Sequence, residues 1–185
     1  QFSGPKPPPW IGASTDSNPG SIVLRWQSSS ESRAYYNIYI SDVSSVYDPD
    51  LPALTQISAN ANGLSVDINP AYWNVPLYFT IVSVDSNGVR GNYSPESWAV
   101  AYTNPENYRG HTYGRVFNLA NNQNISNTTL EFFLITNWPT QDGNFDIEYY
   151  PGFYLTTTVA SGYFSSVAPI QIIASNSTSY DFGLN

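Results

Sequence analysis

The chain has 185 residues and a formal net charge of −8 at pH 7, from 14 acidic and six basic residues. So few basic residues cannot neutralise several phosphates, which disfavours nucleic-acid binding. The absence of Cys excludes disulfides, thiolate zinc sites and thiol nucleophiles.

The first segment, residues 1–11, contains four Pro and predicts an extended arm. Proline excludes the helix interior and fixes φ near the polyproline value. We interpret the arm as either a flexible linker or a docking segment.

Residues 12–104 predict a β-sandwich, because short runs of alternating apolar residues are separated by turn signals such as Asn18-Pro19-Gly20. No helical period interrupts them. We expect strands near 21–27, 35–41, 64–68, 77–84 and 98–102, a spacing typical of an antiparallel sandwich with about seven strands.

Three segments of this region resemble a fibronectin type III domain. Ser21–Trp26 resembles the second strand of that family, with Trp26 in the place of its buried core Trp, and residues 36–41 resemble the third strand. Residues 78–88, followed by 91–95, resemble the sixth strand and the turn into the last one. The resemblance covers about residues 7–103 and implies the fold; such modules serve adhesion, spacing and oligomer building alike.

Residues 105–185 predict a second small sandwich, which makes the chain all-β with two consecutive antiparallel β-sandwich domains. We expect six strands, one fewer than a seven-stranded sandwich, near 112–119, 130–137, 145–150, 153–159, 169–174 and 180–184.

Nothing in the sequence predicts an active site, a metal site or a cofactor. His111 is the single imidazole, and no Gly-x-Ser-x-Gly elbow accompanies it. Two carboxylate pairs, Asp48 with Asp50 and Asp146 with Glu148, are interpreted as turn residues and as the solvent face of a strand. We therefore expect the protein not to be an enzyme.

The sequence offers two weaker candidates for ligand sites. The loop from Asp142 to Asp146 resembles a calcium loop only superficially, since Gly152 stands where the loop's Glu would be. Several aromatic residues of this half could form a stacking platform for sugars, but aromatic residues are also ordinary strand residues, which we favour. These aromatic residues are Trp138, Tyr149, Tyr150, Tyr154 and Tyr163.

Four sequons for N-glycosylation are present, at Asn92, Asn124, Asn127 and Asn176. The last three lie in polar turns, where a glycan can be carried, whereas Pro95 weakens the first. Glycans would keep a surface with only 11% charged residues soluble. The small number of carboxylates also predicts tolerance of acid, because few groups must be protonated to unfold the chain.

Assembly is the function that these features favour. Uncharged strand edges pair unless they are covered, and a domain one strand short could receive a strand from a neighbouring copy. The expected docking residues are Phe2, Trp10 and Ile11 in the arm, or alternatively Tyr180, Phe182 and Leu184 at the other end. The alternative for the arm is an ordinary flexible tail. Lys6 lies in the arm, and an isopeptide link would need it buried beside an acid.

The absence of Met, even at Gln1, favours a chain from which a leader was removed, with a segment cut from a longer chain as the alternative. No apolar run is long enough to span a membrane. The composition and layout resemble subunits of archaeal threads, which are non-type-IV pili joined by donor strands. This resemblance implies a glycosylated, extracellular cell-surface filament subunit of a heat- and acid-adapted archaeon, with copies of itself and N-linked glycans as partners. The alternative is a carbohydrate-binding or spacer module of a secreted enzyme or adhesin.

Overall fold

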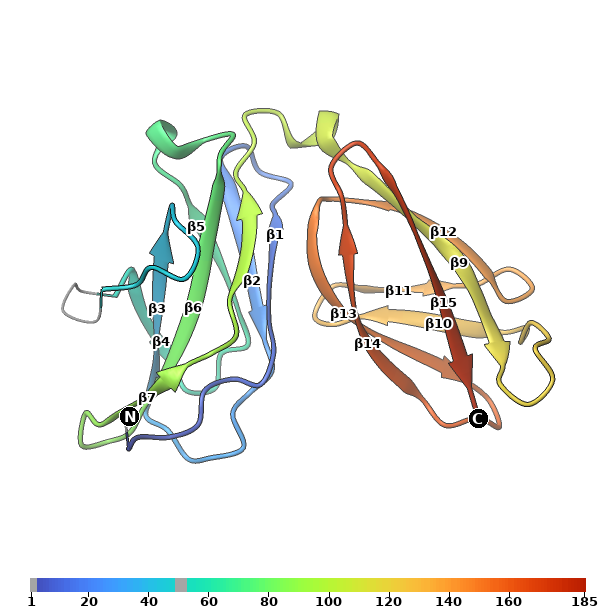
Figure 1. Ribbon diagram of the computed structural model, residues 1–185, viewed down its shortest axis with the longest axis horizontal. Helices are drawn as coiled ribbons and strands as arrows, with labels where there is room; N and C mark the ends of the chain where they lie inside the picture. Colours follow the sequence, from blue (N-terminus) through green and yellow to red (C-terminus); the bar gives the residue numbers. More distant parts are fainter. Residues whose placement is uncertain (1–2, 49–52) are drawn as a thin grey trace. The chain divides into compact units, whose positions relative to one another are not determined.

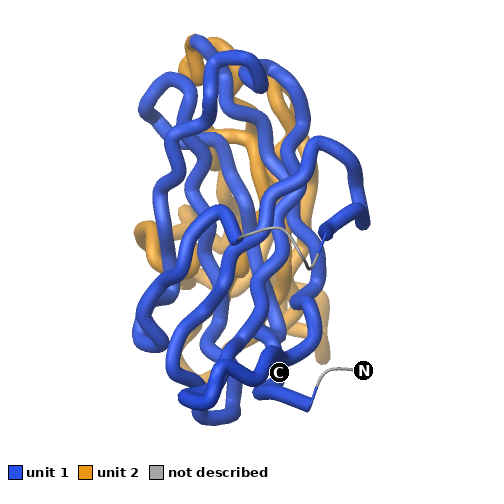
Figure 2. The backbone as a smooth tube through the Cα atoms, turned by 90° about the vertical axis from the view of Figure 1, so that its left-hand side faces the viewer, with its two compact units in different colours: residues 1–103 blue, residues 104–185 orange. Residues whose placement is uncertain are grey.

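The computed structural model describes residues 3–48 and 53–185 and is all-β. Its contacts divide it into two compact units, residues 1–103 and 104–185 (Figures 1 and 2). None of the helices among the described residues is long and apolar enough to cross a membrane.

The first unit is a fibronectin type III-like β-sandwich. One sheet has the antiparallel order β1-β2-β5, and the other has the order β4-β3-β6-β7, with β8 paired to the first residues of β6. A single 3-10 turn, η1 (Pro70–Tyr72), precedes β6. The strands are β1 (Ile11–Thr15), β2 (Ser21–Trp26), β3 (Tyr35–Ser41), β4 (Thr55–Ser58), β5 (Gly63–Asp67), β6 (Pro76–Val84), β7 (Arg90–Tyr93) and β8 (Ser97–Val100).

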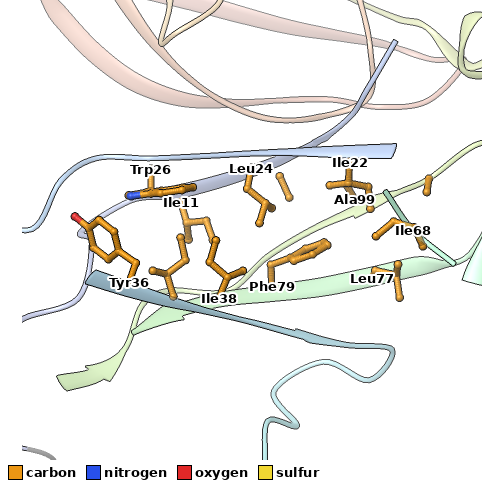
Figure 3. Packing of buried hydrophobic residues seen from close by; sticks show 13 residues of the cluster. Ile11, Ile22, Leu24, Trp26, Tyr36, Ile38, Ile68, Leu77, Phe79 and Ala99 are labelled. Carbon is orange, nitrogen blue, oxygen red and sulfur yellow. The ribbon is translucent and has the colours of Figure 1, made fainter. Parts of the chain in front are cut away.

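The core of this unit follows from the alternation in β2. Ile22, Leu24 and Trp26 are fully buried and lie opposite apolar side chains of β3 and β6 (Figure 3). The Trp26 ring meets the Tyr36 ring edge-on, with 5.7 Å between centroids, a favourable aromatic geometry. Trp26 is therefore the buried tryptophan that the resemblance implied.

The described part of the loop between β3 and β4 covers the outer face of the sheet that contains β3 and β6. The strand β6 is therefore buried on both faces. Tyr47, from this loop, is tilted against Tyr93, and its hydroxyl donates to a Glu96 carboxylate oxygen at 2.6 Å. Two serines of the loop complete the anchor: the Ser44 hydroxyl and the Ser45 backbone N–H each donate to Glu96 at 2.7 Å. Partial burial raises the pKa of Glu96, but these three hydrogen bonds outweigh it, and its net pKa lies below its ordinary value.

The second unit is a sandwich of seven strands, not six. Its sheets have the orders β12-β9-β15 and β11-β10-β13-β14, and β15 runs parallel to β9 (Figure 1). The strands are β9 (Gly110–Asn118), β10 (Thr128–Phe132), β11 (Thr136–Pro139), β12 (Asn144–Tyr149), β13 (Gly152–Ala160), β14 (Ser166–Ile172) and β15 (Ser177–Leu184).

The expectation of a missing strand was wrong because residues 130–137 do not form one strand. The chain turns back after Phe132, where the Ile135 N–H donates to the Phe132 carbonyl at 3.0 Å. Leu134, within this turn, has a φ of 58°, which is unusual for a residue other than Gly, Asn or Asp. The reversal produces β10 and β11 as a hairpin.

The chain enters the second unit through η2 (Pro105–Tyr108), which an ionic cluster attaches to the sandwich. The Arg109 guanidinium donates to Glu106 at 2.7 Å and to the Tyr150 hydroxyl at 2.9 Å, and that hydroxyl donates to Glu106. Hydrogen bonds from Arg109 and then Tyr150 lower the pKa of Glu106.

Candidate functional site

The arm lies along the edge strand β7 of its own unit. The Gly4 N–H donates to the Arg90 carbonyl at 3.0 Å, and Pro5 is buried. The two backbones approach so closely that side chains cannot separate them: a Cβ on Gly91 would stand 1.8 Å from the Pro5 carbonyl oxygen. Only glycine permits this approach, so the edge of β7 is shaped to receive an extended segment.

An ion pair also holds the arm. The Lys6 side chain lies 3.0 Å from Glu31, whose other carboxylate oxygen accepts from the Lys6 backbone N–H at 2.8 Å. The backbone hydrogen bond to Lys6 is the main cause that lowers the pKa of Glu31. Because the Lys6 side chain is 73% exposed, it lacks the burial that an isopeptide link requires.

Of the three docking residues expected in the arm, the structure describes Trp10 and Ile11. Phe2 lies outside the described residues. Trp10 is half-buried, and its carbonyl accepts from the Gln27 N–H at 3.1 Å. Ile11 begins β1 and is only 4% exposed, within the core of the first unit, so it stabilises its own sandwich. The arm as a separate segment therefore ends at Trp10.

The docking residues expected at the other end lie within the second unit's own sandwich. Phe182 and Leu184 are 5% and 1% exposed, and β15 pairs with β9 along its whole length. The Tyr180 hydroxyl accepts from the Gln171 N–H at 2.9 Å. The strand β15 is therefore already paired and packed within its own domain.

All four sequon asparagines have exposed side chains. Asn92 lies on the edge strand β7, Asn124 and Asn127 precede β10, and Asn176 immediately precedes β15. They differ in hydrogen bonding, since the Asn124 side-chain nitrogen donates to the Asp142 carbonyl at 3.3 Å and to the Asn144 side-chain oxygen at 3.2 Å.

The acidic candidates that the structure describes are exposed. Asp48 is exposed, and Asp50 lies outside the described residues. Asp146 and Glu148 point outward from β12, and the His111 ring nitrogen lies 3.2 Å from Asp146. Within residues 3–48 and 53–185, no group of three His, Cys, Asp or Glu residues is placed to hold a metal ion.

The aromatic residues proposed as a sugar platform mostly form core. Tyr154 is 1% exposed and Tyr150 7%, and their rings pack around Tyr149 at centroid distances of 5.7 and 5.3 Å. Tyr163 is half-buried and accepts a hydrogen bond from Asn118 at 3.2 Å. The five rings therefore do not form one exposed plane.

No protein-family model matches the chain, and no curated protein matches it. Among solved structures, a Fn3-like protein from Clostridium thermocellum shares 20% identity over 52% of this chain and 93% of its own, with a TM-score of 0.43. The FN1–FN3 domains of chicken CNTN1 share 13% identity over 96% of this chain and 68% of theirs, with a TM-score of 0.40.

BcpA, the major pilin subunit of Bacillus cereus, shares 9% identity, and the match covers 95% of this chain and 58% of that protein, with a TM-score of 0.33. The expected likeness to archaeal threads finds no support among these three structures. At such TM-scores the likenesses carry no inference about function.

Proposed function

We propose that the chain is a structural, glycosylated subunit of an extracellular cell-surface filament that serves adhesion, without catalysis of its own. Neighbouring copies are joined by strand donation. The observation that carries this proposal is the extended arm lying against the edge strand β7, with the Gly4 N–H bonded to the Arg90 carbonyl.

The same contacts can be made between copies. An arm that leaves its own β7 and occupies β7 of a neighbour keeps every hydrogen bond and ion pair, so the exchange costs little free energy. Each copy then donates one arm and receives one, and a heterologous contact of this kind extends into a fibre. Pro7, Pro8 and Pro9 favour an extended arm with a length of about 3.1 Å per residue.

The composition supports a role at an exposed surface. With 11% charged residues the chain lacks the charged side chains that usually protect strand edges. The exposed sequons offer glycans in their place, and Asn92 would carry one on β7 itself, beside the arm.

A second candidate function is a carbohydrate-binding module of a secreted enzyme or adhesin. A polar groove with an aromatic wall in the second unit favours it, and that groove is described in the next subsection.

The test removes residues 1–9, which spares the Trp10 carbonyl and the buried Ile11. We expect the shortened protein to remain folded by circular dichroism but to form no fibres by negative-stain electron microscopy. A synthetic peptide of residues 1–10 should bind it and raise its melting temperature.

A point variant tests the same contact without shortening the chain. Gly91→Ala places a Cβ where the Pro5 carbonyl lies and should also prevent fibres, whereas the neighbouring Asn92→Gln should not. Fibres of normal length from both the shortened protein and Gly91→Ala would refute assembly through the arm.

A further inference from the structure

A groove of about 530 Å³ lies in the second unit beside β11 and β12. Trp138 and Pro139 of β11 form part of its wall, and Asn144 and Asp146 of β12 line it as well. Both β11 and β12 are edge strands within their unit.

A rigid turn adds two more polar side chains to the groove, those of Gln141 and Asp142. Gln141 and Asn144 exchange backbone hydrogen bonds of 2.8 and 2.9 Å across this turn. Asp142 and Gly143 have φ values of 50° and 79°, as in the tight hairpin turns that Asp-Gly favours. The Asp142 carboxylate is therefore presented from a fixed backbone.

The aromatic wall is also held in place. The Phe132 ring packs against the half-buried Trp138 with 4.4 Å between centroids, and the Tyr149 ring lies edge-on at 5.5 Å. These contacts fix the indole while part of it lines the groove. An aromatic ring held in one orientation binds a flat ligand without first losing conformational freedom.

The polar groups beside it are oriented by neighbours as well. The Asn144 side-chain oxygen accepts from Asn124, and Asp146 is held by His111. The groove thus combines one fixed aromatic surface with two carboxylates and two amides, and no Lys or Arg lines it. Carboxylates and amides bind hydroxyl groups well, and an indole covers the apolar C–H face of a pyranose ring.

We propose that this groove binds an uncharged saccharide. The hydroxyls of the sugar donate to Asp142 and Asp146, and one ring stacks on Trp138. Acidic sugars are disfavoured because two carboxylates and no Lys or Arg line the groove. The site is independent of the arm, so its failure would leave the proposed filament intact. The saccharide has two possible sources, a free polysaccharide or the glycan of another copy.

The first experiment uses unglycosylated full-length protein and calorimetric titration with cellohexaose, mannohexaose, xylohexaose and chitohexaose. We expect millimolar or tighter binding of at least one, and at least tenfold weaker binding of hexagalacturonate. No binding to any of the four neutral sugars, or equal binding of the acidic one, would overturn the proposal.

Matched variants locate the site. Trp138→Ala should weaken binding at least tenfold, while Phe164→Ala, which removes an aromatic side chain 82% exposed elsewhere in the unit, should not. Because Trp138→Ala also removes core contacts, Asp146→Ala provides a second test, with Glu148→Ala from the same face of β12 as its control. Binding unchanged in both Trp138→Ala and Asp146→Ala would overturn the site.

The second experiment distinguishes the source of the sugar. Glycosylated protein without residues 1–9, which does not assemble through the arm, is compared with its Asp146→Ala variant by light scattering. Self-association that is lost in the variant and competed by the binding hexasaccharide identifies the glycan of another copy. Unchanged self-association identifies a free saccharide as the ligand.

Discussion

Shortening Leu184 tests whether β15 belongs to its own domain. Leu184 is 1% exposed in the core of the second unit, and truncating a buried Leu to Ala costs about 2–5 kcal/mol. For a domain of 60–100 residues each kcal/mol corresponds to roughly 4–8 °C. Leu184→Ala should therefore lower the melting temperature of this unit by roughly 8–40 °C.

The matched control is Leu119→Ala. Leu119 lies next to β15, its N–H donating to the Leu184 carbonyl at 3.0 Å, but its side chain is 51% exposed. Removing a half-exposed side chain should cost less than about 1 kcal/mol.

The assay is thermal unfolding by circular dichroism, combined with amide hydrogen exchange resolved by peptide. In Leu184→Ala, protection should fall in peptides of residues 110–184 and remain in those of residues 11–100. In the protein without residues 1–9, which does not assemble through the arm, the midpoint should not change on dilution, because β15 pairs within its own chain. A midpoint that rises with protein concentration, or an equal loss of protection in both units, would refute this assignment of β15.

Three further predictions concern charge and modification. The carboxylate of Glu96 has a lowered pKa, so it stabilises the native state above its ordinary pKa of 4.5 and loses this effect as the pH falls through the folded-state value. Urea unfolding should show Glu96→Gln less stable than the parent at pH 7, with a smaller difference at pH 3; an equal difference at both would contradict it. In a host that glycosylates folded chains, glycopeptide mass spectrometry should find Asn127 occupied more often than Asn124, whose nitrogen is hydrogen-bonded; the reverse order would contradict the reasoning. The intact unglycosylated protein should show no loss of ammonia or water, because Lys6 forms an exposed ion pair with Glu31; such a loss, absent in Lys6→Ala, would disprove it.

The fold was predictable where apolar residues alternate. Ile22, Leu24 and Trp26 in β2 and the run that ends in Phe182 and Leu184 in β15 have a period of two, and in both strands these residues form core. In this pattern each buried side chain is flanked by more exposed ones, which marks both the strand and its inner face.

The sequence did not predict β11 as a separate strand, because the turn between β10 and β11 contains no Gly, Pro, Asn, Asp or Ser. Phe133, Leu134 and Ile135 are apolar, so the sequence continues the pattern of a buried strand through the reversal. The tertiary structure imposes a positive φ on Leu134, a conformation that a propensity-based reading assigns to Gly or Asn.

The docking residues could be only partly predicted, since an edge is a property of the assembled sheet. Ile11 follows a Pro-rich arm and was interpreted as part of it, but the chain has already entered β1 at that residue. The closeness of Gly4 and Pro5 to β7 joins segments more than 80 positions apart, and no local pattern reports such a contact.

The parallel pairing of β9 and β15 has a mechanical consequence. Their register runs in parallel from Ser177 opposite His111 to Leu184 opposite Asn118, so the chain enters this pair at one end and leaves it at the other. Tension applied through the chain therefore loads the hydrogen bonds between the two strands sideways and together, where an antiparallel hairpin would open one bond at a time. The second unit should therefore resist a pull between the two ends of this strand pair better than an antiparallel hairpin would.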